Sequence, residues 1–494
     1  METVKKTFMK NVQKTSVNLK LRPFWAVVFT MFAFVFLVSP VQAQQIRIGS
    51  GVHFVNGTQV NIKGDGIVNL GTLRNKATGV IKLTGNWQND GTCSSDNGSV
   101  VTLAGSFAQV IGGSNPTTFG TLSLNNSAGF SLTNDISVNG ALDFQNGMLA
   151  TGNYLVTIGD AGTITNASSS KHVDGRLAMT FSALGSKSFP IGKEGNYRPL
   201  TLQYSGLTGT SIVTAEQFES GLDGTLPENT TILTSGRHWT ISEAGGNNVQ
   251  YFLTLDATDY TPSRPVLMIK QDAGTMVSYP TTSPASLHYS NASALNTFSN
   301  FGLGELCVNP TDGGTIASAQ AACVSLDPAA MTGSAPTGET GTLQYQWQHS
   351  TSGSLAGFSD IAGATSLTYD PSTLTATTWY KRLAKVTCKP VGVWVESNVL
   401  AMTVNPAPVP VISGAAGVTQ GQVVTYSTPN VAGHTYTWNA SHGNPELCFP
   451  NRNCLTLTWD FPCGIINPGY VKVTETNPAT GCSATYTLPI TINP

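Results

Sequence analysis

The residues of this chain that could do chemistry are few, and the carboxylates of its N-terminal third come first. Cleavage of a glycosidic bond needs paired carboxylates, or an acid with a Lys or Arg base, converging on one face. The candidates between residues 44 and 174 are Asp65, Asp90, Asp96, Asp135, Asp143, Asp160 and Asp174. Most of them lie in Asp-Gly or Asn-Asp sequences, which are typical of turns. We therefore predict no catalytic residue, and we expect the protein not to be an enzyme.

Metal and cofactor sites are equally poorly supported. Gly64-Asp65-Gly66 and Asn89-Asp90-Gly91 could offer backbone carbonyls to calcium, but turns commonly have this composition. His238 has no acidic or histidine neighbour at a ligand spacing, and we interpret it as a half-buried strand residue. The chain contains no Gly-x-Ser-x-Gly, His-Glu-x-x-His, P-loop or EF-hand pattern. The sequence thus predicts no metal site, no cofactor-binding residue and no cofactor.

Residues 1–43 read as a signal peptide. Six Lys and Arg residues precede an apolar run from Phe24 to Val38, and Val41-Gln42-Ala43 supplies the small residues that signal peptidase requires. A membrane anchor is the alternative, but the run is shorter than the roughly 20 residues of a spanning helix. No second apolar run follows. We expect cleavage after Ala43, no stable membrane span thereafter, and a location outside the cell or on its outer surface.

The eight cysteines of an exported chain favour disulfides, because the extracellular compartment is oxidising. Zinc is the alternative, but no Cys-x-x-Cys pair occurs. Cys323 and Cys388 flank Trp347, as in an immunoglobulin-type core, and we predict that they pair. Four more are predicted to pair among themselves: Cys448, Cys454, Cys463 and Cys482. Cys93 and Cys307 lie in other modules and are expected to be free.

Composition and charge define the fold class and exclude one kind of partner. Only 11% of residues are charged and Gly numbers 51, a bias that favours turns and strands. From Gln44 onward the chain holds 19 Lys and Arg against 26 Asp and Glu, a net charge of −7 without a basic stripe. Nucleic acid binding depends on clustered Lys and Arg. We predict an all-β protein that binds no nucleic acid.

Residues 44–174 repeat a Gly or Asn-Gly turn followed by three to five alternating apolar and polar residues. Val80-Ile81-Lys82-Leu83 and Val100-Val101-Thr102-Leu103 are examples. Such short strands cannot be stable alone, but stacked coils bury a continuous column of Val, Ile and Leu. The spacing between these runs is irregular, which argues against the alternative of a β-sandwich with frequent hairpins. The sequence therefore predicts a right-handed β-solenoid.

Three β-sandwich modules are predicted to follow the solenoid. Longer strands separated by Pro and Gly indicate the first, over residues 175–306. Tyr345-Gln-Trp-Gln348 and Trp379-Tyr-Lys-Arg-Leu383 alternate as strands and indicate an Ig-like domain over 307–406. Ala407-Pro-Val-Pro410 reads as a stiff linker. The strands after it, including Gly469-Tyr-Val-Lys-Val473, indicate a PKD-like β-sandwich over 407–494.

The run from Gly85-Asn-Trp-Gln-Asn-Asp-Gly-Thr92 to Ala128-Gly-Phe-Ser-Leu132 resembles the N-terminal solenoid of modular secreted and surface proteins of Bacteroidota. Such solenoids precede Ig-like and PKD-like domains. The resemblance implies a structural, adhesin-like protein whose partners are carbohydrate or other surface proteins. A polysaccharide-binding or polysaccharide-degrading protein is the alternative. Trp87 is the first candidate for a ligand contact, and its alternative role is packing inside the solenoid. Cys93 departs from the family, which usually has an aromatic residue there.

Overall fold

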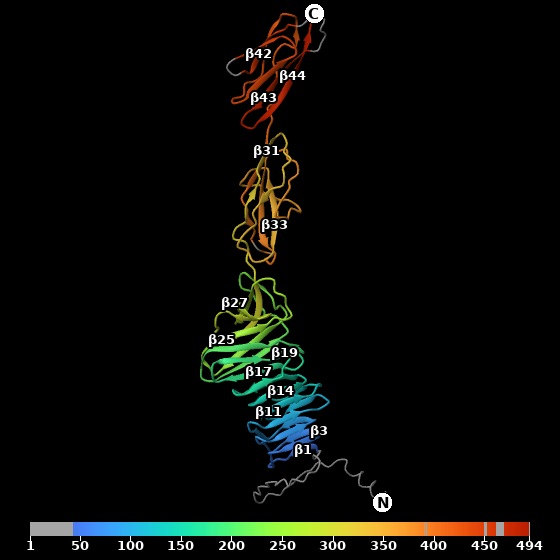
Figure 1. Ribbon diagram of the computed structural model, residues 1–494, viewed down its shortest axis with the longest axis vertical. Coiled ribbons are helices and arrows are strands. Elements are labelled where there is room, and N and C mark those ends of the chain that lie inside the picture. The colour runs from blue at the N-terminus through green and yellow to red at the C-terminus, as the bar shows by residue number, and fades with distance from the viewer. Residues whose placement is uncertain (1–42, 390, 392, 449–451, 461–468, 494) are drawn as a thin grey trace, which may run out of the picture. The chain divides into compact units, whose positions relative to one another are not determined.

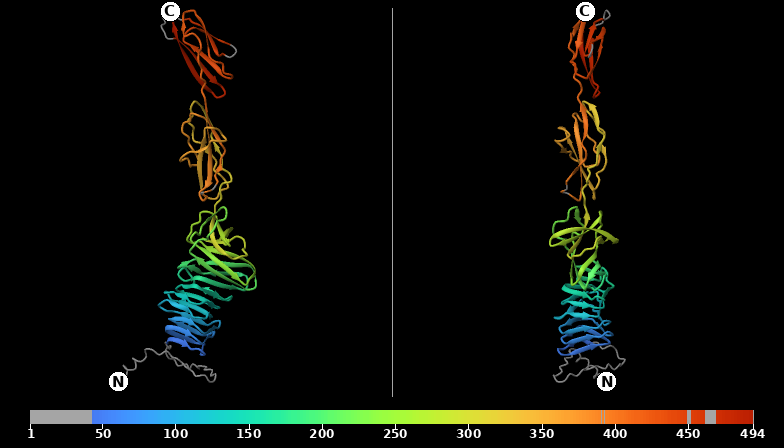
Figure 2. Two further views of the ribbon diagram at one scale, coloured as in Figure 1. Left: turned by 180° about the vertical axis from the view of Figure 1, so that it is seen from behind. Right: turned by 90° about the vertical axis from the view of Figure 1, so that its left-hand side faces the viewer.

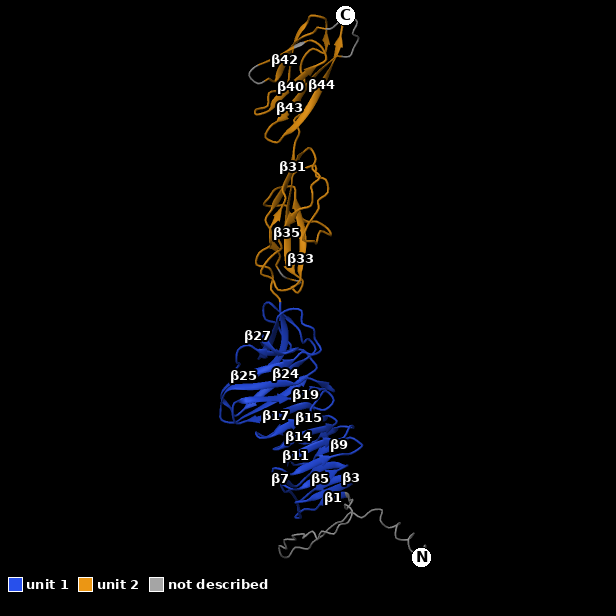
Figure 3. Cartoon of the chain, viewed as in Figure 1, with its two compact units in different colours: residues 1–306 blue, residues 307–494 orange. Residues whose placement is uncertain are grey.

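The computed structural model describes residues 43–389, 391, 393–448, 452–460 and 469–493, and the predicted signal peptide lies outside this part of the chain. The described residues form strands and turns with no helix, so the protein is all-β. No helix of a length and apolar character suited to crossing a bilayer occurs among them. The chain divides into two compact units, unit 1 up to Leu306 and unit 2 from Cys307 (Figure 3).

Unit 1 begins with a β-solenoid whose coils each contribute strands to three parallel ladders, stacked one on another in all views (Figures 1 and 2). The strands of these coils are β1 (Ala43–Ile48), β2 (His53–Asn56), β3 (Gln59–Asn69), β4 (Thr72–Asn75), β5 (Val80–Leu83), β6 (Asn86–Asn89), β7 (Thr92–Ser95), β8 (Val100–Leu103), β9 (Gln109–Gly112), β10 (Thr117–Phe119), β11 (Thr121–Asn125), β12 (Phe130–Leu132), β13 (Ile136–Val138), β14 (Ala141–Asn146), β15 (Leu149–Ile158) and β16 (Thr163–Thr165).

The coils repeat with a nearly constant length, because strands in successive coils pair in register. One inward column runs through Ile62, Leu83, Leu103, Leu124 and Phe144, whose members are 21, 20, 21 and 20 residues apart. All five side chains are buried. The predicted solenoid is therefore confirmed, whereas the irregular spacing inferred from the sequence is wrong, since the turns vary while the strand register holds.

Glycine allows the coils to approach each other at the corners. Gly66 has a φ of 95°, and a Cβ there would lie 2.0 Å from the carbonyl oxygen of Asn86 in the next coil. A side chain would therefore meet backbone that cannot give way. This explains why Gly punctuates the solenoid sequence.

The strand β17 (Val173–Phe181) joins the solenoid to an antiparallel β-sandwich. It pairs in parallel with β15 on one edge and antiparallel with β22 on the other. A single hydrophobic core consequently continues from Ile48 in the first coil to Leu303 in the sandwich. The sandwich strands are β18 (Gly185–Phe189), β19 (Ile191–Lys193), β20 (Asn196–Tyr197), β21 (Leu200–Thr208), β22 (Ser211–Phe218), β23 (Thr230–Ile232), β24 (His238–Ala244), β25 (Asn247–Asp256), β26 (Val266–Asp272), β27 (Thr275–Ala285), β28 (His288–Asn291) and β29 (Asn300–Leu306).

Unit 2 contains two β-sandwiches, each with its own core. The first is formed by β30 (Ile316–Ala317), β31 (Gln320–Cys323), β32 (Thr332–Gly333), β33 (Leu343–Ser350), β34 (Ser359–Asp360), β35 (Thr378–Val386), β36 (Val395–Glu396) and β37 (Leu400–Asn405). The second is formed by β38 (Gly417–Val418), β39 (Val423–Ser427), β40 (Thr435–Ala440), β41 (Asn444–Leu447), β42 (Cys454–Thr458), β43 (Gly469–Asn477) and β44 (Cys482–Ile492).

A buried arginine links segments of the first sandwich where an immunoglobulin-type disulfide was expected. The Arg382 side chain is fully buried with its guanidinium 6.0 Å from the Trp347 ring centroid. Its Nη atoms donate to the carbonyl oxygens of Leu367, Gly313 and Ser334 at 2.9, 3.2 and 2.7 Å. Burial lowers the pKa of Arg382, so these bonds offset the cost of desolvating its charge. The arginine thus connects three backbone segments around the tryptophan.

Candidate functional site

The solenoid carboxylates fasten one coil to the next rather than gathering in one place. Six of the seven candidates bind a group 20 to 24 residues away along the chain, which is one coil. These pairs are Asp90 with Ser114, Asp96 with Arg74, Asp135 with Leu155, Asp143 with Asn166, Asp160 with Ser182, and Asp174 with Glu194. An inter-coil hydrogen bond explains each of these acids.

Asp143 and Asp160 show how these bonds stabilise the ionised form. Burial by itself raises the pKa of Asp143, but hydrogen bonds from Gln145, Asn166, Thr165 and Ser123 outweigh it, and the pKa lies below its usual value. Hydrogen bonds from Ser182 lower the pKa of Asp160. A general acid must carry a proton near the working pH, which these groups do not. Their chemistry is that of fixed anionic acceptors.

Trp87 is a core residue. Its side chain is 1% exposed, its ring centroid lies 5.1 Å from that of Phe119, and its Nε1 donates to Thr117 Oγ1 at 3.2 Å. The strand register places it between Ile67 and Ile111 of the adjacent coils. The interpretation of Trp87 as an exposed ligand contact is therefore wrong, because period-two alternation directs this side chain inward.

Cys93 occupies an inward position as well. It pairs in register with Leu73 of the preceding coil and packs against the same core. Desolvation raises the pKa of its thiol to about 12, so the reactive thiolate is scarce at neutral pH. Cys93 forms no disulfide and replaces an aliphatic side chain in the column.

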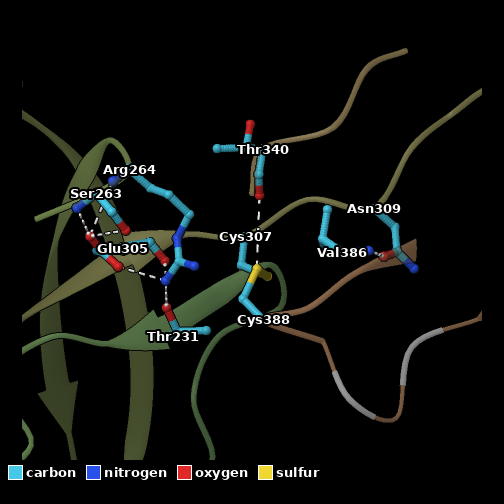
Figure 4. Close-up of a disulfide and its surroundings, with 9 residues drawn as sticks. All are labelled: Thr231, Ser263, Arg264, Glu305, Cys307, Asn309, Thr340, Val386 and Cys388. Carbon is cyan, nitrogen blue, oxygen red and sulfur yellow. Dashed lines mark hydrogen bonds and ion pairs between the residues drawn. A yellow bond between two sulfur atoms is a disulfide. The ribbon is translucent and has the colours of Figure 1, made fainter. Parts of the chain in front are cut away.

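The disulfides of unit 2 differ from the predicted pairs. Cys307 bonds to Cys388, beside the hydrogen bond from Val386 N to Asn309 Oδ1 (Figure 4). Cys323 bonds to Cys482. The predictions of a Cys323–Cys388 pair and of a free Cys307 are therefore wrong, since sequence spacing says nothing of which strand ends meet.

The cysteines after Pro410 do not pair only among themselves, because Cys482 bonds outside that set. Cys448 and Cys454 bond to each other across a short loop. Cys463 lies outside the described residues. The described residues also contain no group of three or more His, Cys, Asp or Glu that could hold a metal ion.

A cleft of about 400 Å³ lies in unit 1, where the solenoid passes into the sandwich. It is lined by Ser169, Gly195, Asn196, Tyr197, Arg198, Pro199, Asp256, Thr258, Asp259 and His288. The Asp256 side chain is 3% exposed, and both its oxygens accept bonds of 3.0 Å from Thr258. Its Oδ1 lies 3.8 Å from Nε2 of His288, which is beyond hydrogen-bond distance. Asp256 and His288 thus face each other without a direct bond.

Two arginines hold the other acid of the cleft ionised. Asp259 accepts from Arg198 Nη2 at 2.5 Å and from Arg237 Nη1 at 3.4 Å. Arg198 also contacts Glu219, at 3.4 Å from its Nε. Arg237 is almost fully buried, and burial, followed by repulsion from Arg198, lowers its pKa. The expected structural role of Arg198 is what the contacts show. A carboxylate held by two cations stabilises a shape rather than transferring protons.

An aromatic pair lies on another side of the cleft. Burial, followed by the nearby charge of Asp256, raises the pKa of Tyr197, so its hydroxyl stays protonated and can donate. His172 is fully buried 5.2 Å from the Tyr197 ring, and burial lowers its pKa. His172 is therefore a neutral packing partner of Tyr197.

His238 lies on β24, outside the lining of the cleft. Its ring stacks on Phe218 with centroids 4.9 Å apart, and its Nδ1 lies 2.6 Å from the Ser220 carbonyl oxygen. The half-buried strand position inferred from the sequence agrees with these contacts.

One family model matches the chain. It is a domain of unknown function, DUF8696, and it matches residues 312–406, the first sandwich of unit 2. No curated protein matches the sequence.

Solved structures of multidomain extracellular proteins match with low similarity. The protocadherin gamma B2 extracellular cadherin domains 3–6 are 12% identical with a TM-score of 0.20, covering 60% of this chain and 83% of that one. The chicken CNTN1 FN1–FN3 domains are 10% identical with a TM-score of 0.17, covering 49% and 94%. An endo-fucoidan hydrolase of glycoside hydrolase family 107 is 12% identical with a TM-score of 0.13, covering 63% and 42%. At these scores none of them bears on activity.

Sequence reasoning missed the cleft. Its charged residues come from segments around 197, 237, 256 and 288, and no spacing rule brings these together. A weak signal was available in Asp256-Ala-Thr-Asp259, two acids at the end of an apolar strand. The arginines that hold them gave no such signal.

Proposed function

We propose that this protein is a secreted or cell-surface structural protein, adhesin-like and non-enzymatic, of the modular kind found in Bacteroidota. The deciding observation is the engagement of six solenoid carboxylates in bonds to neighbouring coils. A parallel β-solenoid that acts on polysaccharide needs acids converging on one substrate. The β-sandwiches and disulfides of unit 2 suit the role of extracellular spacers, with the last one proposed to be PKD-like.

The test is a turnover assay on the chain from Gln44 to Pro494. Plant and algal polysaccharides are screened by reducing-end release for hydrolysis and by absorbance of unsaturated products for elimination. We expect neither signal to exceed that of buffer. Reproducible turnover that disappears in Asp143→Asn or Asp90→Asn would overturn the structural assignment.

We propose as a second candidate function that the cleft of unit 1 binds a neutral saccharide. Arg198 and Arg237 are engaged by Asp259 and Glu219, so the carboxylate of Asp256 dominates the local charge. Sulfated or uronic sugars would be repelled by it. Hydroxyl groups, in contrast, can donate to Asp256 and accept from the Tyr197 hydroxyl, with the tyrosine ring as an apolar surface.

Binding of neutral and sulfated oligosaccharides to immobilised protein tests this second candidate. We expect a neutral oligosaccharide to bind, fucoidan fragments to bind more weakly, and Asp256→Asn to lose about tenfold in affinity, the effect of one charge-assisted hydrogen bond. Asp65→Asn, on an exposed solenoid turn, is the matched control and should bind as wild type. Equal affinity of wild type and Asp256→Asn for every sugar, or no binding at all, would refute it.

A further inference from the structure

The two long disulfides of unit 2 interleave along the chain. Their cysteines occur in the order 307, 323, 388 and 482, and Cys307 bonds to Cys388 while Cys323 bonds to Cys482. The first bond spans 81 residues and the second 159. Each bond therefore begins inside or before the loop that the other closes, and neither loop can be opened independently of the other.

The longer bond connects the two sandwiches beside the linker that already joins them. Cys323 ends β31 and pairs in register with Asn405, the last residue of β37. The linker starts at the next residue and contains Pro406, Pro408 and Pro410. Cys482 starts β44, at the end of the hairpin that this strand forms with β43. The two sandwiches are thus held by two covalent connections, one through the chain and one through sulfur.

This arrangement removes most of unit 2 from the covalent path that a pulling force would follow. From Cys307 the shortest path runs 16 residues to Cys323, crosses to Cys482 and continues 12 residues to Pro494. The strands of both sandwich cores between Cys323 and Cys482 lie off this path. We propose that the Cys323–Cys482 disulfide is a mechanical lock, which limits how far unit 2 can extend when the protein bears tension.

The interleaving gives the Cys307–Cys388 bond a different role. While the lock is closed, this bond shortens nothing, because the path already leaves the main chain at Cys323. When the lock is open, the path crosses instead from Cys307 to Cys388, and the 81 residues between them remain protected. The second bond is therefore a reserve that acts when the first is broken.

Single-molecule stretching of the full chain from Gln44, held at both ends, tests this proposal through the final contour length. Replacing Cys323 and Cys482 by Ser should lengthen the path by about 72 residues, or roughly 250 Å at 3.3–3.6 Å per residue. Replacing Cys307 and Cys388 alone should add nothing. Replacing all four should add about 153 residues, or roughly 530 Å. Two single effects that simply add would overturn the proposal.

A second variant keeps the test decisive if the cysteine variants do not fold. About 20 Gly and Ser residues are inserted between Ala407 and Pro408, in a flexible sequence that leaves every cysteine in place. Because the linker lies off the locked path, we expect no gain in contour length. A gain of roughly 70 Å would show that tension runs through the linker and would refute the lock. Replacing Cys448 and Cys454, whose bond spans 6 residues inside the locked loop, is the matched control and should also add nothing.

The biological meaning of the lock rests on the proposed structural role, but its measurement does not. Contour length reports the covalent path alone, and the polysaccharide assays report chemistry. A protein that degrades polysaccharide could still carry the lock, and a structural protein could lack it. The two proposals can therefore fail separately.

Discussion

The solenoid of unit 1 and the sandwiches of unit 2 close their β cores with contacts of different reach along the chain. In the solenoid, strands and fastening side chains find partners about one coil away, and the buried Cys93 forms no disulfide. In unit 2, the two longest cross-links span 81 and 159 residues. The solenoid thus depends on many short-range contacts, whereas unit 2 depends on a few long-range ones.

This difference has a thermodynamic reason. Closing a loop costs entropy that rises with its length, so a partner one coil away is reached at a smaller cost than one 159 residues away. A disulfide offsets that cost by restricting the unfolded chain. We therefore expect damage to a coil to remain in unit 1 and to scale with the local packing lost, while loss of a cross-link in unit 2 should scale with the length of its loop.

The largest effect is expected from the Cys307–Cys388 bond. Replacing both residues by Ser should lower the free energy of unfolding of unit 2 by about 4.5 kcal/mol in the chain-entropy model, because the loop is long. The same change at Cys448 and Cys454, whose loop is short, should cost about 2 kcal/mol in that model. Urea denaturation of the oxidised full chain measures both. Equal losses for the two pairs would contradict the role of loop length.

Trp87→Ala should have the next largest effect, confined to unit 1. Removing this buried ring leaves a cavity among the coils and should cost about 4 kcal/mol. Phe107→Ala, at a side chain that is 84% exposed, is the control and should leave stability unchanged. Hydrogen exchange resolves the two units. Faster exchange throughout unit 2 in Trp87→Ala would mean that the units do not unfold separately.

The sequence was sufficient where the structure depends on short-range pattern. Alternation in segments such as Val80–Leu83 predicted strands, and the glycine at position 66 predicted a turn. The all-β class and the solenoid followed from these features. The same alternation could have placed Trp87 inside, since Ile67 and Ile111 occupy its position in the adjacent coils.

The sequence was insufficient where partners are far apart. Cys388 has several possible partners, and only the fold brings Cys307 to it. The expected Cys-Trp-Cys core failed because Arg382 connects the segments around Trp347, and an arginine within a strand gives no sign of such a role. The cleft around Asp256 depends on four distant segments in the same way.

A smaller effect is expected from the asparagines at the solenoid corners. Asn69 and Asn89 are buried, and Asn69 Nδ2 donates to Asn89 Oδ1 at 2.8 Å and to the carbonyl oxygen of Thr92 at 2.9 Å. Asn69→Ala leaves these buried acceptors without their donor and should cost about 2 kcal/mol. Asn153→Ala, at an exposed position, is the control. A loss below that of the control would show that water replaces the ladder.

The smallest effect per residue is expected from protonating the fastening carboxylates. Hydrogen bonds lower the pKa values of Asp90 and Asp160, and those of Asp143 outweigh the opposing effect of burial. An aspartate is protonated near pH 3.9 in the unfolded chain. A group whose pKa is lower in the folded state contributes stability above the unfolded value, and this contribution is lost as pH falls through the folded value. Unit 1 should therefore keep its stability from pH 7 to about 5 and lose it progressively below about 4.

Urea denaturation of the full chain between pH 7 and pH 3, with Trp87 fluorescence reporting unit 1, measures this dependence. Asp143→Asn removes one titrating fastener, so its stability should fall less steeply with acid than that of wild type. Phe107→Ala keeps every carboxylate and should reproduce the wild-type slope. If Asp143→Asn had the wild-type slope, the carboxylate would not fasten the coils through its charge. The neutral ladders of backbone and asparagine bonds would then hold the solenoid alone, and the contrast with unit 2 would rest on loop length only.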